Sequence, residues 1–147
     1  MRSVLAALAV LALAGCNNMT SPNQGGQSVD LTGKWVGDFM VLGQDGSITW
    51  QLTQNGAMVS GPVTVALLNG VVAVNGTLSG TYAASTLTYT IDVPAGGIPS
   101  QPNCVGQISG TATVTVAAAT TMTGPYSVTS NNCAQPFPGG TVTLTKQ

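Results

Sequence analysis

The sequence predicts an all-β domain of about eight antiparallel strands that follow one another as an up-and-down meander. Three observations lead to this prediction. Apolar and polar residues alternate at a period of two, Asn-Gly and Asp-Gly pairs separate the alternating runs, and no stretch after residue 16 has a helical period. We expect the strands to close into a small barrel, because closure leaves no exposed sheet edge. A two-sheet β-sandwich is the alternative.

Each expected strand places its apolar residues at one parity, with mostly Thr, Ser, Gln or Asn between them. Successive side chains of a strand point to opposite faces, so the apolar parity marks the buried face. In chain order the apolar sets are Trp35/Gly37/Phe39/Val41, Ile48/Trp50/Leu52, Val59/Gly61/Val63/Val65/Leu67, Val72/Val74/Leu78/Tyr82, Leu87/Tyr89/Ile91/Val93, Ile108/Gly110/Ala112/Val114/Val116, Met122/Gly124/Tyr126/Val128 and Val142/Leu144.

The connections between these runs carry the turn chemistry of hairpins. Asp45-Gly46, Asn55-Gly56 and Asn69-Gly70 supply the positive φ that tight turns need. Further short connections are expected at about 81–85 and at 117–119. Two connections are long and contain prolines, at 94–103 and 130–140.

A short triplet, an apolar residue followed by Ser or Thr and then Gly, occurs five times. Glycine inside a strand permits a bend, a bulge or a close approach of two backbones. We therefore expect these glycines at the corners of a strongly coiled sheet. The alternative is chance, because the chain contains 19 glycines. The five glycines are Gly33, Gly61, Gly80, Gly110 and Gly124.

Residues 1–15 have the layout of an export signal. One positive charge at Arg2 precedes ten apolar residues at 4–13, and small residues follow. The apolar run is too short to span a bilayer, which takes about 20 residues. Leu13-Ala14-Gly15-Cys16 resembles the lipobox of bacterial lipoproteins, which implies that Cys16 carries the lipid that anchors the protein to the membrane. An ordinary signal cleaved after Ala14 is the alternative.

The resemblance to bacterial lipoproteins also implies a location. Asn17 follows the cysteine where an Asp usually retains Gram-negative lipoproteins in the inner membrane, so we expect the outer membrane. The residues after Cys16 are rich in Asn, Gln, Gly and Ser, as in a flexible tether. The expected organisation is a signal at 1–15, the lipidated cysteine with its tether at 16–30, and the barrel domain at 31–147.

The two remaining cysteines, Cys104 and Cys133, are expected to form a disulfide, because exported proteins meet an oxidising compartment. A metal or redox site is the alternative. The chain has no His, no Glu and no Cys-x-x-Cys pair to support one. We expect no metal site and no cofactor.

Charge is scarce: 5% of the residues are charged, against about 25% in typical proteins. The chain after the signal has a net charge of −2 and no basic patch, which argues against binding to nucleic acid. Catalysis is not expected either. General acid–base work would fall to Asp38, Asp45 or Asp92, and each is more simply a solvated surface residue.

Gly33-Lys34-Trp35 resembles the G-x-W motif of lipocalin and calycin barrels. The resemblance implies that Trp35 closes one end of the barrel by packing under the first strand. The string Leu31-Thr32-Gly33-Lys34-Trp35 is also similar to the first strand of avidin. The match covers about five residues. The tryptophans that line the avidin ligand site and the C-terminal helix of lipocalins have no counterpart here.

Three kinds of function remain open. The first is a non-catalytic binding module for a small apolar ligand or an envelope protein partner. The second is a structural envelope lipoprotein without a ligand. The third, an integral outer-membrane barrel, is disfavoured because aromatic residues are few and the chain ends in Lys146-Gln147. We favour the binding module and expect a monomer.

An even number of meander strands predicts where a partner would bind. The tether and the end of the last strand then share one end of the barrel, and the two long connections share the other. Long ordered loops are commonly functional, so we expect the contacts at this distal rim. The alternative is that these loops only cap the barrel. The candidate contacts are Ile98, Gln101, Asn103, Asn131, Asn132, Gln135 and Phe137.

Overall fold

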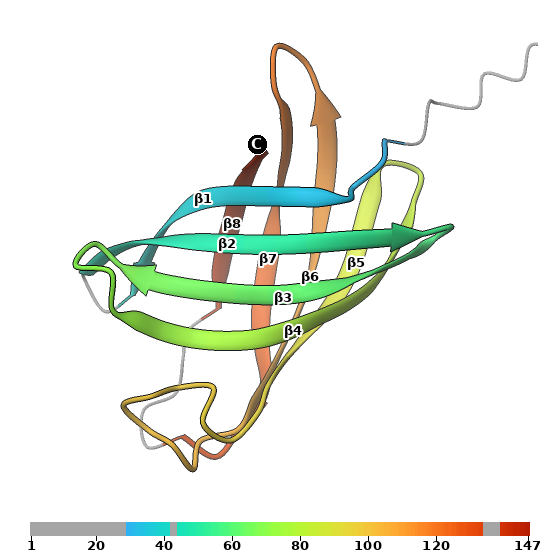
Figure 1. Cartoon of the computed structure of the whole chain (residues 1–147). Helices are drawn as coiled ribbons and strands as arrows, with labels where there is room; N and C mark the ends of the chain where they lie inside the picture. Colours follow the sequence, from blue (N-terminus) through green and yellow to red (C-terminus); the bar gives the residue numbers. More distant parts are fainter. Residues whose placement is uncertain (1–28, 42–43, 134–138) are drawn as a thin grey trace, which may run out of the picture.

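The protein folds into a closed barrel of eight antiparallel strands, seen in a computed structural model that describes residues 29–41, 44–133 and 139–147 (Figure 1). The all-β meander prediction is confirmed, and a barrel forms in place of the alternative sandwich. The described ranges contain no helix that could cross a membrane. The strands are β1 (Gly33–Val41), β2 (Gln44–Asn55), β3 (Met58–Leu67), β4 (Val72–Ala83), β5 (Thr86–Val93), β6 (Gly106–Val116), β7 (Thr120–Asn131) and β8 (Gly140–Lys146).

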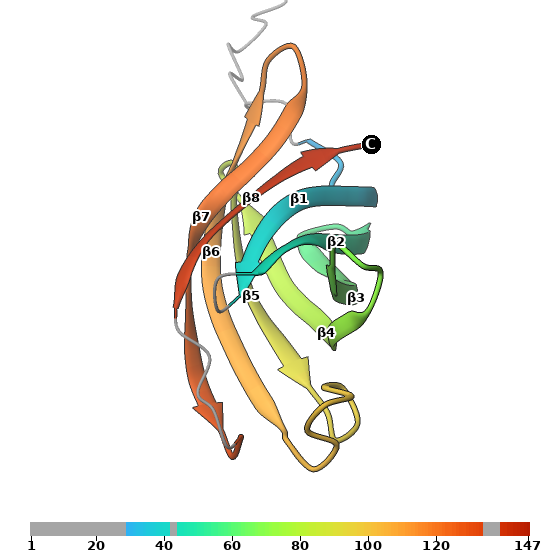
Figure 2. The same cartoon turned by 90° about the vertical axis from the view of Figure 1, so that its left-hand side faces the viewer.

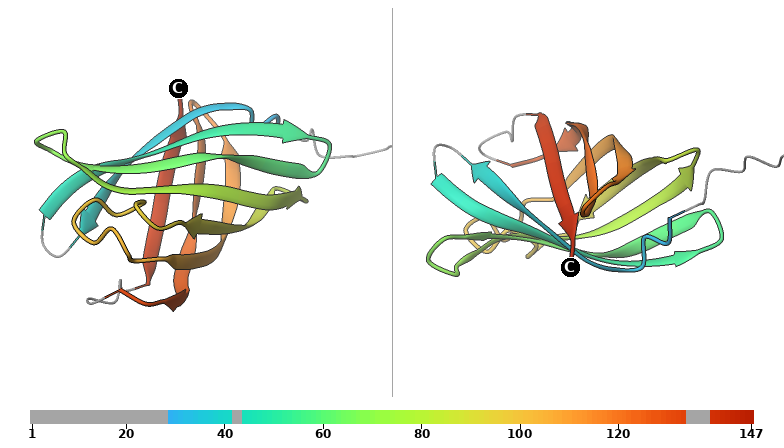
Figure 3. Two further views of the ribbon diagram at one scale, coloured as in Figure 1. Left: turned by 60° about the horizontal axis from the view of Figure 1, so that its bottom comes forward. Right: turned by 90° about the horizontal axis from the view of Figure 1, so that it is seen from above.

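Each strand pairs with the next one along the chain, and β1 pairs with β8 to close the barrel. This closing seam is short. It contains two residue pairs, Trp35 with Lys146 and Val36 with Thr145, whereas β1 pairs with β2 along its whole length. Figure 3 shows β1 and β8 meeting near the end of β8 and diverging from there. Gln147 adds a hydrogen bond of 2.9 Å from its N–H to the carbonyl oxygen of Lys34, and a Cβ on Gly37 would overlap the carbonyl oxygen of Thr143, so the strands stay in close contact just beyond the pairs.

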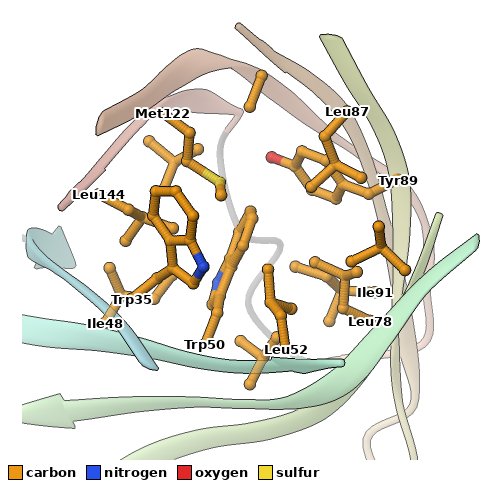
Figure 4. Close-up of a cluster of buried hydrophobic side chains, with 14 of the residues drawn as sticks. Trp35, Ile48, Trp50, Leu52, Leu78, Leu87, Tyr89, Ile91, Met122 and Leu144 are labelled. Carbon is orange, nitrogen blue, oxygen red and sulfur yellow. The ribbon is translucent and has the colours of Figure 1, made fainter. Parts of the chain in front are cut away.

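The interior is built from the apolar parity of every strand. The described residues that are fully buried and large include Trp35, Trp50, Leu52, Leu78 and Leu87. Figure 4 shows their side chains pointing from opposite walls toward the middle of the barrel. Burying one side chain of this size contributes roughly 1.5–3 kcal/mol, so this interior dominates the stability of the fold.

Most of the in-strand glycines mark close approaches of neighbouring strands. A Cβ on Gly61 would overlap the carbonyl oxygen of Gln51, and one on Gly124 would overlap that of Thr111. Gly33 is the exception among the five predicted positions, because a Cβ there would only touch the Lys146 side chain at 3.4 Å. The backbones can approach this closely because no side chain stands between them.

Glycine and tyrosine alternate along one row of paired residues that runs across five strands. A Cβ added to Gly110 would lie 2.6 Å from the hydroxyl of Tyr89, and one added to Gly140 would lie 2.9 Å from that of Tyr126. Each tyrosine ring therefore covers the glycine of the next strand, which replaces the packing that the glycine lacks. In order from β4 to β8 the row is Gly80, Tyr89, Gly110, Tyr126 and Gly140.

The turns match the sequence prediction in part. Gly56 and Gly70 have positive φ values of 60° and 79° in the turns predicted for them. The prediction of a turn at Asp45-Gly46 is wrong, because both residues lie inside β2, where Gly46 pairs with Leu67. The strand pairing uses this glycine for a close approach: a Cβ there would overlap the carbonyl oxygen of Ala66.

Candidate functional site

The end of the barrel at which the chain enters carries the predicted Gly33–Trp35 motif. Trp35 is fully buried, and its Nε1 donates a hydrogen bond of 2.8 Å to the carbonyl oxygen of Leu31. The Lys146 ammonium lies 5.9 Å from the centroid of the Trp35 ring and donates a hydrogen bond of 2.6 Å to the carbonyl oxygen of Asp30. These contacts hold the segment before β1 against the end of β8.

The opposite end carries the disulfide. Cys104 and Cys133 are bonded, with their Cα atoms 4.8 Å apart, so the predicted pairing is confirmed. Cys104 precedes β6 and Cys133 follows β7, whereas Asp30 and Gln147 flank the start of β1 and the end of β8. Figure 2 shows the β5–β6 connection and the end of β8 at opposite ends of the molecule. The prediction that the disulfide lies at the end opposite Asp30 and Gln147 is therefore confirmed.

The connection between β5 and β6, residues 94–105, is held by its own hydrogen bonds. Gly96 donates to the carbonyl oxygen of Pro102 at 2.7 Å, and Cys104 donates to that of Gln101 at 2.8 Å. The carbonyl oxygen of Gly97 accepts a hydrogen bond of 2.7 Å from Asn75 on β4. With the disulfide to the segment after β7, these bonds fix the loop at both flanks.

The structure brings part of the predicted rim together. Asn103 and Asn132 are exposed beside the disulfide. Asn132 Nδ2 donates a hydrogen bond of 3.4 Å to the carbonyl oxygen of Asn103. Asn131 is exposed at the end of β7, and Gln101 is half-buried. Gln135 and Phe137 lie outside the described residues.

Ile98 does not belong to the outer rim. Its side chain is 3% exposed and packs in the hydrophobic core. An apolar side chain gains free energy by leaving water, so the loop turns Ile98 inward while its asparagines stay outside. A ligand would meet Ile98 only from the interior of the barrel.

The interior contains one polar group without a partner. Trp50 is 1% exposed, and its Nε1 has no hydrogen-bond acceptor among the described residues. A buried donor left in this way costs about 1–3 kcal/mol. The parity of β2 predicted an inward Trp50, but nothing in the sequence signalled the missing acceptor.

Tyr89 is the ionisable group nearest to Trp50. The two rings meet edge to face with centroids 4.9 Å apart. Burial raises the pKa of Tyr89 well above its usual range, and the neighbouring Tyr126 adds to the rise. Its hydroxyl therefore stays neutral.

The aspartates lie on the outside of the barrel. Asp38, Asp45 and Asp92 are exposed, and Asp92 Oδ1 accepts a hydrogen bond of 2.9 Å from Gln107. Across the described ranges no three His, Cys, Asp or Glu residues gather in a metal-binding group. The geometry thus offers an apolar interior for holding a molecule, with exposed asparagines at the distal rim.

Comparisons with protein family models, curated proteins and solved structures find no match to this chain.

Proposed function

We propose that this protein is a lipid-anchored protein of the bacterial outer membrane, with a lipocalin-like barrel that binds a small apolar ligand without catalysis. The export signal and the lipobox-like sequence around Cys16 support the anchor. Cys16 itself lies outside the described residues. The eight-stranded meander barrel supports the lipocalin-like reading, because a barrel of this size either is filled by side chains or holds one small ligand.

The observation that carries the binding function is the loop at 94–105. A disulfide and a set of backbone hydrogen bonds fix this loop, and it sends Ile98 into the core while Asn103 stays exposed. The loop therefore connects the outer rim with the interior. A small apolar ligand would lie behind Ile98, inside the barrel.

Native mass spectrometry of the protein purified from its own envelope tests this function. We expect a co-purified small molecule on the wild type and its loss in Ile98→Asn. Met58→Asn is the matched control, because Met58 is an exposed apolar residue in the β2–β3 hairpin at the other end of the barrel and should retain the ligand. A wild-type protein free of any ligand would refute the binding function.

The alternative function is a structural lipoprotein of the envelope. The observation that favours it is the filling of the interior by large apolar side chains, including two indoles that are at most 1% exposed. If the protein is a structural lipoprotein, Ile98 only caps the core. The same experiment separates the two functions.

The lipid anchor is tested on the N-terminus of the mature protein. Mass spectrometry should show a lipid-modified Cys16 as the first residue, and Cys16→Ser should abolish membrane attachment. An unmodified mature protein that begins at another residue would contradict the anchor.

A further inference from the structure

The two tryptophans of the chain allow a comparison inside one molecule. Trp35 on β1 and Trp50 on β2 are paired residues, and both indoles point into the barrel (Figure 4). The Trp35 donor is used by the carbonyl oxygen of Leu31 at 2.8 Å. The Trp50 donor is equally buried and is not used by the described part of the protein.

An unused donor in this position points to a ligand, because phenylalanine would fill much of the same space without an N–H to satisfy. In an apolar surrounding, a hydrogen bond is stronger than in water. A molecule that brings an acceptor to Trp50 therefore gains more here than at the surface, and this selects against ligands that have no acceptor.

The surroundings of Trp50 define the rest of the ligand. Figure 4 labels apolar side chains around Trp50, together with Trp35 and Tyr89, which carry polar atoms. No charged side chain is buried in the described part of the chain. The only described cations, Lys34 and Lys146, lie at the entry end, where Lys146 is bonded to Asp30. A charged ligand group beside Trp50 would have no partner, and the ligand must be neutral there.

We propose that Trp50 Nε1 is the ligand-binding donor of the barrel, and that the ligand is a small, neutral, largely apolar molecule with one accepting oxygen, such as the carbonyl of an ester or ketone. The inference rests on the proposed binding function and names the chemical class of the ligand.

Indole N–H signals in NMR spectra of the mature protein in nanodiscs provide the test, because the chain has only two tryptophans. The Trp50 signal is assigned by its contact with the Tyr89 ring. The probes are methyl octanoate, octane and octanoate, which share an apolar chain and differ in the acceptor and the charge. We expect methyl octanoate to shift the Trp50 N–H downfield while the Trp35 N–H stays in place.

A binding comparison with Trp50→Phe completes the test. The variant should bind methyl octanoate about tenfold more weakly than the wild type and bind octane unchanged. Octanoate should bind more weakly than the ester. If ester and octane bind equally and the Trp50 signal does not move, the donor role is wrong while the binding function stands. If no probe binds and no ligand co-purifies, both proposals are overturned.

Discussion

Replacing Gly124 with alanine should separate β6 from β7 and destabilise the barrel. A Cβ at this position would lie 2.8 Å from the Cα of Ala112 and would overlap the carbonyl oxygen of Thr111. Both obstacles are backbone atoms of the paired strand, so no side chain can move aside. The strain must be relieved by a shift of the strands themselves.

The magnitude follows from this shift. Carbon atoms make favourable contacts at about 3.5–4.0 Å, so the strands must part by roughly 1 Å. A shift of this size stretches the neighbouring ladder hydrogen bonds beyond about 3.2 Å, the upper end of their normal range. Losing about two such bonds, together with the packing around Met122, amounts to roughly 2–4 kcal/mol. That is a large fraction of a typical stability of about 5–15 kcal/mol.

Urea denaturation of the oxidised protein, followed by tryptophan fluorescence, measures the effect. Gly56→Ala is the matched control, because Gly56 has a φ of 60° and no atom within 4 Å of an added Cβ. Its cost comes from backbone conformation alone and should be about 1–2 kcal/mol. The reasoning is refuted if Gly124→Ala lowers the free energy of unfolding less than Gly56→Ala does.

Three further predictions concern other parts of the barrel. Ala84→Asn with Ser85→Gly should raise the free energy of unfolding by about 1 kcal/mol, because these residues hold φ values of 48° and 64° that suit Asn-Gly; a lower melting temperature would contradict this. Removing the disulfide with Cys104→Ser and Cys133→Ser should cost about 3–4 kcal/mol for a separation of 29 residues, and a reductant should then have no further effect on thermal unfolding. Burial raises the folded-state pKa of Tyr89 above its unfolded value of about 10, so stability is fully present below that pH and declines above it; urea midpoints that stay level from about pH 8 to about pH 11 would argue against this.

The strands and their buried faces were predictable because the backbone itself imposes the period of two. In β5, Leu87 and Ile91 are buried and Thr88 and Asp92 are exposed, as the alternation requires. The number of strands then placed the disulfide at the end opposite Asp30 and Gln147. No single residue carries that information, but the count does.

Local turn chemistry predicted some turns correctly, whereas Asp45-Gly46, which has the same chemistry, lies inside β2. Asn69-Gly70 forms a turn as predicted, since glycine adopts positive φ readily. The turn at Ala84-Ser85 carries no such signal, because the pairing of β4 with β5 forces two ordinary residues into positive φ. The extended pairing of β4 with β5 outweighs the preference of Ala84 and Ser85 for negative φ.

The candidate site depended on contacts between distant parts of the chain. The hydrogen-bond acceptor of Trp35 comes from the segment before β1, whereas Trp50 Nε1 has no acceptor among the described residues. The alternation of apolar and polar residues predicts that a side chain points inward, but not whether its N–H meets an acceptor. Ile98 lies in a loop with proline on either side of it and no periodicity, so its inward direction follows only from the folded loop.

The short seam between β1 and β8 has a consequence for how the chain folds. Every other strand pair joins neighbours in sequence, and such hairpins close small loops at little entropic cost. The seam alone joins the two ends of the domain, and its two residue pairs return few hydrogen bonds for that closure. Folding should therefore zip along the meander from hairpin to hairpin and shut the ring last. Because β6 and β7 form one of those hairpins, Cys104 and Cys133 meet before the ring shuts, and oxidation can precede the final step.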